Sequence, residues 1–509
     1  MKRRFWIVFV LLCLIVAGYG WFWRHARPVK NIILMIGDGM GPQQISLLLQ
    51  YAKQAPDAAA VPDRTLSLER LIAAGETGMM STYPKDNLVI DSAASATHLA
   101  TGEFTRTEMV GLNRNGFFAE TLLEKARRLG KSTGLVTDTR VTHATPAAFA
   151  AHQMHRSMEN EIAEDILKTQ PDVILGGGLR HWLPADDPRS KRKDHRDLIQ
   201  EARSLGYGVV TTKQEMFQSN GPMILGLFSN SLMPDAIEMH QNRNNSDFPV
   251  PSLKEMTKTA LETLSRNKKG FFLMVEGGLI DYAGHFNDAG WMLHELLAFD
   301  ETIGRVYEWA KNRDDTLVVV TADHETGSFG LSYSKYHIPS AQKLSSGQYH
   351  QPRFNFGSAR MLDGLYQQKK SFMRILYEFD HLSAHLRTSR HLQKFINDAS
   401  VFKISRRDAE AVLATEPNRF YVKGHEYLSD SIEPRIHDFK EYYVYGSENR
   451  AALIARAMAR EQQVVWGTGT HTSTPVPLFV LGPKKVTRKF DGLLHAREVG
   501  RLLQGVMNP

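Results

Sequence analysis

Short apolar runs alternate with segments of helical periodicity over most of this chain, and this alternation restricts the fold more than any other feature of the sequence. The apolar runs typical of β-strands lie at 31–36, 133–137, 172–175, 270–275 and 316–321. The helical segments lie at 118–129, 159–169, 253–265 and 289–311. Strands that alternate with helices predict an α/β fold: a three-layer, doubly wound, mostly parallel sheet with helices on both faces. Ligand sites in such folds lie beyond the carboxyl ends of the strands.

The alternation stops between residues 331 and 465, where Tyr, Phe, His, Lys and Arg are frequent. Helical patterns within this segment are confined to stretches such as 379–396 and 449–461. Apolar runs return after it, at 464–466 and 476–481. We therefore predict one α/β domain, residues 31–330 and 466–509, that carries residues 331–465 as an insertion. The seven histidines of the insertion show no tight ligand spacing, which favours solvated positions.

The amino terminus combines an uncharged segment, residues 5–23, with basic residues on both sides of it. As a helix this segment would be about 28 Å long, enough to cross the hydrocarbon core of a bilayer. A cleaved signal peptide is the alternative, but the run is longer than usual and no convincing small-x-small site follows it. We therefore favour an uncleaved signal anchor in residues 1–30, with the body exported to the periplasm or the extracellular space. Secretion after cleavage is the alternative.

Charge and cysteine content narrow the function of the body. The net charge of the 509-residue chain is +7, but six basic residues and no acid lie within residues 1–30. The remainder is almost neutral, which excludes the basic surface that nucleic-acid binding needs. The single cysteine, Cys13, lies in the uncharged segment. The body therefore has neither disulfides nor thiolate ligands, and any metal ion must be held by His, carboxylate or hydroxyl groups.

Acidic and histidine side chains gather just after the predicted strands. Asp38 follows the first strand, Glu276 follows the strand at 270–275 with Asp281 and His285 beyond it, and Asp323-His324 follows the strand at 316–321. Each pattern alone is weak, because such residues are common in turns and on solvated helices. Their joint placement at strand ends would bury several charges together, which is costly unless divalent cations neutralise them. The spacing of Asp281 and His285 suits a zinc-type site.

The small-residue segment 91–97, Asp-Ser-Ala-Ala-Ser-Ala-Thr, predicts a tightly packed helix that begins at or just after Asp91-Ser92. A hydroxyl at a helix amino terminus lies beside free backbone N–H groups and the positive end of the helix dipole. These groups bind phosphate and stabilise an attacking alkoxide. An ordinary N-cap is the alternative interpretation, since Asp and Ser both favour that position.

Five motifs together resemble the alkaline phosphatase family. They occur in the order of that family between residues 31 and 483. Their sequences are Ile-Gly-Asp-Gly-Met-Gly at 36–41, the segment 91–97, Ala-Thr-Pro-Ala-Ala at 144–148, Val-Glu-Gly at 275–277 followed by Asp281 and His285, and Thr-Ala-Asp-His-Glu-Thr-Gly at 321–327.

The resemblance implies three metal sites. One Zn²⁺ would be bound by Asp281, His285 and His471. A second Zn²⁺ would be bound by Asp38, Asp323 and His324, with Ser92 as an exchangeable ligand. One Mg²⁺ would share Asp38 and add Thr145 and Glu276. Nitrogen-rich ligand sets suit zinc and an all-oxygen set suits magnesium, so the ligand types agree with these metals.

The same resemblance assigns the groups around the metals. Arg156 falls where the family keeps its phosphate-clamping arginine, and Asp91 would hold its guanidinium in place. His143 and Tyr282 occupy positions next to the metal ligands where some family members have other residues. These two differences leave the identity of the third metal open. His471 precedes its strand instead of following one, so that strand would run antiparallel or be reached by a returning loop.

The activity that the resemblance implies is hydrolysis of phosphate monoesters through a phosphoserine on Ser92, with broad specificity and an alkaline optimum. It also implies a homodimer and a crown-like insertion near the active site. A phosphodiesterase or nucleotide pyrophosphatase usually has a threonine nucleophile, so Ser92 argues against that alternative. A sulfatase needs the sequence x-Pro-x-Arg after its nucleophile, and this sequence does not follow Ser92. A phosphoglycerate mutase relative would be cytoplasmic, in conflict with the anchor. The alternative from a different functional class is a non-catalytic, membrane-anchored protein that binds phosphate or metal.

Overall fold

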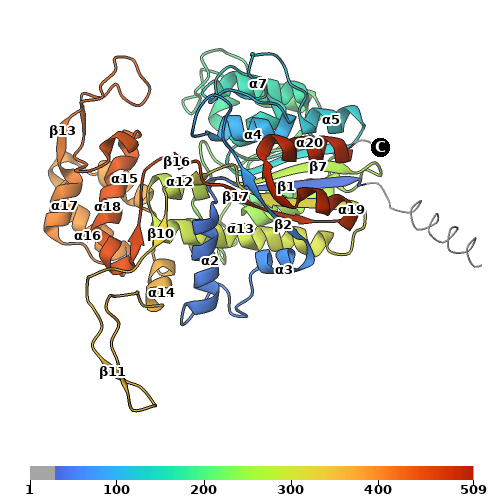
Figure 1. The fold of residues 1–509 in the computed structure, drawn as a ribbon. Helices are drawn as coiled ribbons and strands as arrows, with labels where there is room; N and C mark the ends of the chain where they lie inside the picture. The colour runs from blue at the N-terminus through green and yellow to red at the C-terminus, as the bar shows by residue number, and fades with distance from the viewer. Residues whose placement is uncertain (1–28, 508–509) are drawn as a thin grey trace, which may run out of the picture.

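Ten strands form the central sheet, in the spatial order β18-β2-β17-β8-β1-β7-β3-β4-β6-β5 (Figure 1). The structure, a computed structural model, describes residues 29–507. The predicted membrane segment, residues 5–23, lies outside the described residues. None of the helices within residues 29–507 has both the length and the apolar composition needed to cross a bilayer.

From β8 to β5, all neighbouring strands of the sheet are parallel. These strands are β8 (Thr316–Thr321), β1 (Asn31–Gly37), β7 (Phe271–Gly277), β3 (Ser132–Arg140), β4 (Val173–Gly177), β6 (Ile224–Leu227) and β5 (Gly208–Val210). Every residue of β1, β7 and β8 is buried, because helices cover both faces of the sheet, and this explains their nearly continuous apolar sequences. The predicted α/β fold with a large, mostly parallel sheet is confirmed.

One strand of the sheet runs against the others. β17 (Val476–Leu481) pairs antiparallel with β8 and with β2 (Glu76–Ser81), and β18 (Gly492–His495) is parallel to β2. The amino end of β17 therefore lies at the same edge as the carboxyl ends of β1, β7 and β8. The antiparallel alternative raised by the position of His471 is the one the structure adopts, and a residue before β17 can reach that edge.

Helices cover the two faces of the sheet in separate layers (Figure 1). One face carries α2 (Pro42–Gln54), α3 (Ser67–Ala74) and α13 (Ala289–Ala310). The other face carries α4 (Ser92–Thr101), α5 (Leu122–Arg128) and α20 (Ala496–Met507). α13 is buried along most of its length, and the Asp288 carboxylate caps its amino end by accepting a hydrogen bond from the backbone N–H of Trp291.

One predicted helix start is wrong. α5 begins at Leu122 and not at residue 118. The Thr121 hydroxyl accepts a hydrogen bond from the backbone N–H of Glu124, and the Glu124 carboxylate accepts one from the backbone N–H of Thr121. This reciprocal capping box places the helix boundary at Thr121, and the residues before it pair in an isolated bridge between Leu112 and Phe118.

The segment 331–465 lies beside the sheet, and its helices are joined by long irregular stretches (Figure 1). Its helices are α14 (Arg360–Tyr366), α15 (Phe372–Asp380), α16 (Ser389–Ala399), α17 (Arg406–Leu413) and α18 (Gly446–Gln462). The predicted stretch 379–396 is not one helix, because Thr388 starts a new one by accepting a hydrogen bond from the backbone N–H of His391. The hairpin of β11 (Gln342–Lys343) and β12 (Tyr349–His350) projects from the body. Of the segment's seven histidines, all except His391 are exposed, as predicted.

Candidate metal centre

Three carboxylates meet where the central strands end. Asp38 follows β1, Glu276 lies near the end of β7, and Asp323 follows β8. β7 and β8 both pair with β1, and Glu276 lies opposite Ile36 in the register, so the three side chains converge on one point. All three are fully buried. His324 follows Asp323 in the chain, and its Nε2 atom lies 3.5 Å from Asp38 Oδ1.

These carboxylates have too few partners for their burial. Both carboxylate oxygens of Asp38, Oδ2 of Asp323 and Oε1 of Glu276 are buried without a hydrogen-bond partner. Burial and the neighbouring carboxylates raise the pKa of Asp38 well above its usual value, and they raise the pKa of Asp323 to about 7 and that of Glu276 to about 8. Buried carboxylates that repel one another are costly unless a cation neutralises them, so the cluster is suited to bind metal ions.

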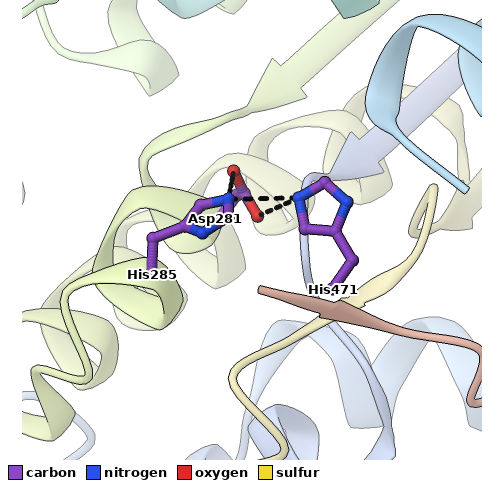
Figure 2. Close-up of side chains that lie close together, drawn as sticks. All are labelled: Asp281, His285 and His471. Carbon is purple, nitrogen blue, oxygen red and sulfur yellow. Dashed lines mark hydrogen bonds and ion pairs between the residues drawn. The ribbon is translucent and has the colours of Figure 1, made fainter. Parts of the chain in front are cut away.

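A second group, Asp281, His285 and His471, comes together beside the first (Figure 2). Asp281 and His285 lie one turn apart on α12 (Leu279–His285), with His285 Nε2 at 3.2 Å from Asp281 Oδ2. His471 Nε2 lies 3.1 Å from His285 Nε2 and 3.5 Å from Asp281 Oδ1. The three side chains thus direct a carboxylate and two ring nitrogens at one small volume, as a tetrahedral metal site requires.

The backbone fixes which ring nitrogen each histidine offers. The Nδ1–H of His285 donates to the Gly469 carbonyl at 2.8 Å, and the Nδ1–H of His471 donates to the Ile90 carbonyl at 2.9 Å. Because a carbonyl oxygen only accepts, the proton of each neutral ring stays on Nδ1 and the lone pair lies on Nε2. Both rings are therefore held in the tautomer that binds a metal through Nε2.

A two-stranded ladder carries His471 to this position. β16 (His471–Thr472) pairs antiparallel with β9 (Glu325–Thr326), which directly follows Asp323-His324. The rings of His471 and His324 stack with their centroids 3.6 Å apart, so the two groups adjoin. Gly39 permits this packing because a Cβ atom there would lie 2.9 Å from the Asp281 backbone, and its φ of +71° also favours glycine.

Ser92 lies at the first position of α4, beside the carboxylate group. Its Oγ atom is 3.1 Å from His324 Nε2, and its side chain is buried. Asp91 is the N-cap and accepts hydrogen bonds from the backbone N–H groups of Ala93 and Ala94. The helix predicted in this segment therefore begins at Ser92, and a hydroxyl and a helix amino terminus are presented together.

Arg156 lies near the start of α4, where it contacts the N-cap residue Asp91. Its Nη1 donates to Asp91 Oδ2 at 3.2 Å, and its Nη2 donates to His143 Nε2 at 3.1 Å. Burial lowers the pKa of the guanidinium, but Asp91 and the phenol of Tyr445 outweigh that effect and raise it. The side chain is therefore a fixed positive charge with donors in a planar fork, which suits an oxyanion such as phosphate.

A family model described as alkaline phosphatase matches residues 29–508. The chain belongs to the alkaline phosphatase family.

Individual relatives agree with this assignment. Alkaline phosphatase 3 of Bacillus subtilis is 31% identical over 481 residues, which cover 93% of this chain and 88% of the relative. Alkaline phosphatase 4 of the same species is 40% identical over 316 residues, which cover 60% of this chain and 64% of that relative. The crystal structure of Thermus thermophilus alkaline phosphatase has a TM-score of 0.75 at 29% identity and covers 94% of this chain and 91% of its own. These findings confirm the family predicted from the motifs and identify the chain as a phosphomonoesterase.

Asp38 and Glu276, two of the three ligands in the third group that the alkaline phosphatase resemblance implied, come together with His143. Asp38, Glu276 and His143 lie within metal-binding distance of one another, and the buried Thr145 Oγ1 on α6 (Ala144–Ala150) has no hydrogen-bond partner. His143 Nε2 accepts from Arg156, so the ring carries its proton on Nδ1. His143 is thus better suited to donate a hydrogen bond than to bind a metal. Tyr282 lies beside it, with the ring centroids 5.9 Å apart.

Several residues at the alkaline phosphatase site were missed from the sequence. Thr137 and Thr139 of β3 both donate to Glu276 Oε2. Tyr445 and Glu448 come from the start of α18, and Glu448 Oε2 lies 3.8 Å from His285 Nδ1. No sequence signal marks Tyr445 or Glu448, because the segment 331–465 lacks the alternation of apolar runs and helices that marks strand ends in the rest of the chain.

Proposed function

We propose that this chain hydrolyses phosphate monoesters through a phosphoserine on Ser92, with two Zn²⁺ ions and one Mg²⁺ ion. The observation that carries the proposal is the set of buried oxygen atoms without partners around Ser92: both oxygens of Asp38, Asp323 Oδ2, Glu276 Oε1 and Thr145 Oγ1. His324 links Asp38 and Asp323 to the nucleophile, because its Nε2 lies 3.5 Å from Asp38, 3.2 Å from Asp323 and 3.1 Å from Ser92 Oγ. His143, which groups with Asp38 and Glu276, accepts a hydrogen bond from Arg156. This arrangement combines metal binding with recognition of a phosphate group.

The donor sets fit the metals that the family resemblance implies. Asp281, His285 and His471 provide one oxygen donor and two nitrogen donors. Asp38, Asp323 and His324 provide two oxygen donors and one nitrogen donor when each offers one atom, and both sets contain the carboxylate and imidazole ligands that zinc accepts. Asp38, Glu276 and Thr145 offer only oxygen, which suits magnesium. Metal ions bound there would lower the pKa of the Ser92 hydroxyl and neutralise negative charge on the phosphate and the departing oxygen.

The chain's own groups direct two displacements at phosphorus. Arg156 donates hydrogen bonds to two non-bridging oxygens and holds the phosphate, while the amino terminus of α4 stabilises negative charge near Ser92. Ser92 Oγ attacks phosphorus, the ester bond breaks, and the alcohol leaves with the bonding electrons and takes up a proton. Water then attacks the phosphoserine from the vacated side, and Ser92 departs with its electrons and regains a proton. Because these contacts are to phosphate, many monoesters fit.

Substitution of the nucleophile tests this function. The purified chain, supplied with zinc and magnesium, is expected to release phosphate from phenyl phosphate, with higher rates at alkaline pH and with loss of activity on chelation. Ser92→Ala should lower kcat by at least about 10³-fold, because the covalent route is removed. Ser204→Ala, an exposed serine on another helix, is the matched control. Wild-type protein that loads metal yet releases no phosphate would contradict the proposal.

We also propose the organisation that the sequence predicts: an anchor in residues 1–30, a catalytic domain of residues 31–330 and 466–509, and an insertion at 331–465. The basic residues around the uncharged segment support the anchor, and the family resemblance supports export and a homodimer. Expression of the full chain should give alkali-resistant association with membranes, whereas removal of residues 1–28 should release it. Light scattering of the released protein measures whether it is dimeric.

A further inference from the structure

Two tyrosines of the segment 331–465 extend the row of aromatic rings that starts at the metal centre. The ring of Tyr445 meets the ring of His285 edge-on, with the centroids 5.1 Å apart. The ring of Tyr427 meets that of Tyr445 at 85°, with the centroids 5.0 Å apart. Tyr445 is half-buried and Tyr427 is 50% exposed, so the row ends at the protein surface. Neither phenol takes part in the mechanism above.

The contacts order these rings by their distance from the nucleophile. Ser92 Oγ contacts His324, the His324 ring stacks on His471, and His471 contacts His285. Tyr445 comes after His285, and Tyr427 comes last. In-line displacement at phosphorus expels the alcohol on the side opposite the attacking oxygen. The two tyrosines lie beyond His285 from the nucleophile, so a leaving alcohol that extends past His285 would meet them.

The backbone around Tyr445 is fastened to the segment that precedes His471. The Tyr442 carbonyl accepts hydrogen bonds from Gly469 N at 3.2 Å and from Thr468 Oγ1 at 3.0 Å. On the other side, Asn449 Nδ2 donates to the Tyr443 carbonyl at 3.1 Å. A Cβ atom at Gly469 would lie 2.8 Å from the Tyr443 ring, so the two segments are in close contact. The position of Tyr445 is thus set by the same loop that delivers a metal-binding histidine.

Space for a ring is available next to Tyr427. This residue lines a cavity of about 180 Å³ within the segment 331–465, together with Phe420, Leu428 and Tyr443. The lining includes neither Tyr445 nor a residue of the candidate metal groups, so the cavity adjoins only the Tyr427 end of the row of rings. Aromatic side chains attract other rings through offset or edge-on contacts, and they do so without regard to the ring's polar substituents.

We propose that Tyr427 and Tyr445 form a binding surface for the leaving alcohol and favour phosphomonoesters whose alcohol carries a planar ring, such as aryl or nucleoside phosphates. This inference rests on the proposed phosphomonoesterase function and adds a substrate preference to it. Catalysis at phosphorus stays general, because Arg156 contacts only the phosphate. The preference arises from the inserted segment and not from the sheet.

Kinetics with two substrates test the preference. The quantity compared is kcat/KM for phenyl phosphate divided by kcat/KM for glycerol 2-phosphate, measured for metal-loaded protein. Tyr427→Ala and Tyr445→Ala should each lower this ratio about fivefold, as expected for a lost aromatic contact. Tyr427→Phe and Tyr445→Phe keep the ring and should keep the ratio within about twofold of wild type. Tyr349→Ala, an exposed tyrosine on the projecting hairpin of the same segment, is the control.

A binding measurement separates recognition from chemistry. Calorimetric titration of metal-loaded Ser92→Ala protein with phenylphosphonate and with methylphosphonate should show that Tyr427→Ala weakens the first about fivefold more than the second. Equal losses for both ligands and both substrates, or Phe variants as poor as the Ala variants, would overturn the inference and leave the phosphomonoesterase function intact. If wild-type protein hydrolyses neither substrate, the proposed function fails and this inference fails with it.

Discussion

Asp38, Asp323 and Glu276 reach the metal centre from the ends of three neighbouring strands, whereas Asp281, His285 and His471 reach it from a short helix and a two-residue strand. We refer to the first set as the sheet-borne group and to the second as the loop-borne group. The sheet-borne carboxylates are completely buried, while the loop-borne side chains lie at the rim, with His471 partly exposed.

The two groups also balance their charge differently. No positive side chain lies within the sheet-borne group, and its carboxylates have raised pKa values. In the loop-borne group, burial acts to raise the pKa of Asp281, but His285 holds it well below its usual value, and Asp281 in turn helps raise the pKa of His285 to about 9. Without metal, the loop-borne group can form its own ion pair, but the sheet-borne group needs a cation. The comparison therefore predicts that substitutions in the two groups change the stability of the metal-free protein in opposite directions.

The largest expected effect on activity comes from substituting a residue that belongs to two candidate metal groups instead of one. Asp38 belongs to two of the three candidate metal groups and His471 to one. Asp38→Ala should reduce kcat/KM by more than about 10³-fold, and His471→Ala by about 10²-fold, because the first substitution removes charge from two sites. Metal content measured by mass spectrometry should fall by more for Asp38→Ala. Equal metal loss in both variants would remove the distinction between the groups.

Metal removal should make stability depend on pH between 6.5 and 9. Asp323 and Glu276, with pKa values of about 7 and 8, stay partly protonated when folded, whereas unfolded carboxylates ionise near pH 4. The folded state therefore binds more protons, and its stability falls as pH rises through these values. The raised pKa of His285 acts in the same direction up to about 9. The Tm of chelator-treated protein should drop by about 5 °C across this range.

The control for the pH experiment is the metal-loaded protein, whose ligands are already deprotonated. Its Tm should change little from pH 6.5 to 9, so the difference between the two forms widens as the pH rises. Differential scanning calorimetry of both forms measures this. A metal-free protein whose Tm is flat or rises over the range would mean that the sheet-borne carboxylates do not retain their protons.

Single substitutions in the two groups should change the free energy of unfolding of the metal-free protein in opposite directions. At pH 9, where Asp323 and Glu276 have lost their protons, Asp38→Asn removes a carboxyl group that interacts unfavourably with them and should stabilise the metal-free protein by about 1–2 kcal/mol. Asp281→Asn breaks the ion pair with His285 and should destabilise it by about 2–3 kcal/mol. Urea unfolding after exhaustive chelation provides the comparison. Stabilisation by both substitutions, or destabilisation by both, would refute the proposed difference in charge balance.

The smallest expected effect concerns the support of the loop-borne group. Burial raises the pKa of Glu448 to about 7, and its carboxylate lies 3.8 Å from His285 Nδ1. Glu448→Gln should weaken metal binding at the loop-borne group about tenfold, as substitutions next to metal-binding histidines do. Competition with a chromophoric chelator measures this affinity. Metal binding at the sheet-borne group serves as the internal reference, and a loss there of the same size would argue for general unfolding.

Residues near strand ends could be predicted from the sequence because the relevant structure is local. Asp38 and Asp323 lie within two residues of apolar runs whose strand character is plain, and the parallel sheet brings such ends together. His471 could be associated with the site only through the family resemblance, since its approach depends on the antiparallel β17 and on pairing between β16 and β9. Tyr445 and Glu448 could not be predicted, because only tertiary packing of an irregular segment places them beside His285.

The ladder between β9 and β16 also sets a sequence of events during synthesis. A growing chain contains every sheet-borne side chain once residue 324 has been made, but it completes the loop-borne group only when His471 emerges after the whole segment 331–465. The ligands that most need a cation are thus available first, and the last ligand comes just before β17, the strand that joins β8 to β2. A chain cut short before residue 471 would lack both His471 and this strand, so the loop-borne group and the central sheet would be incomplete together.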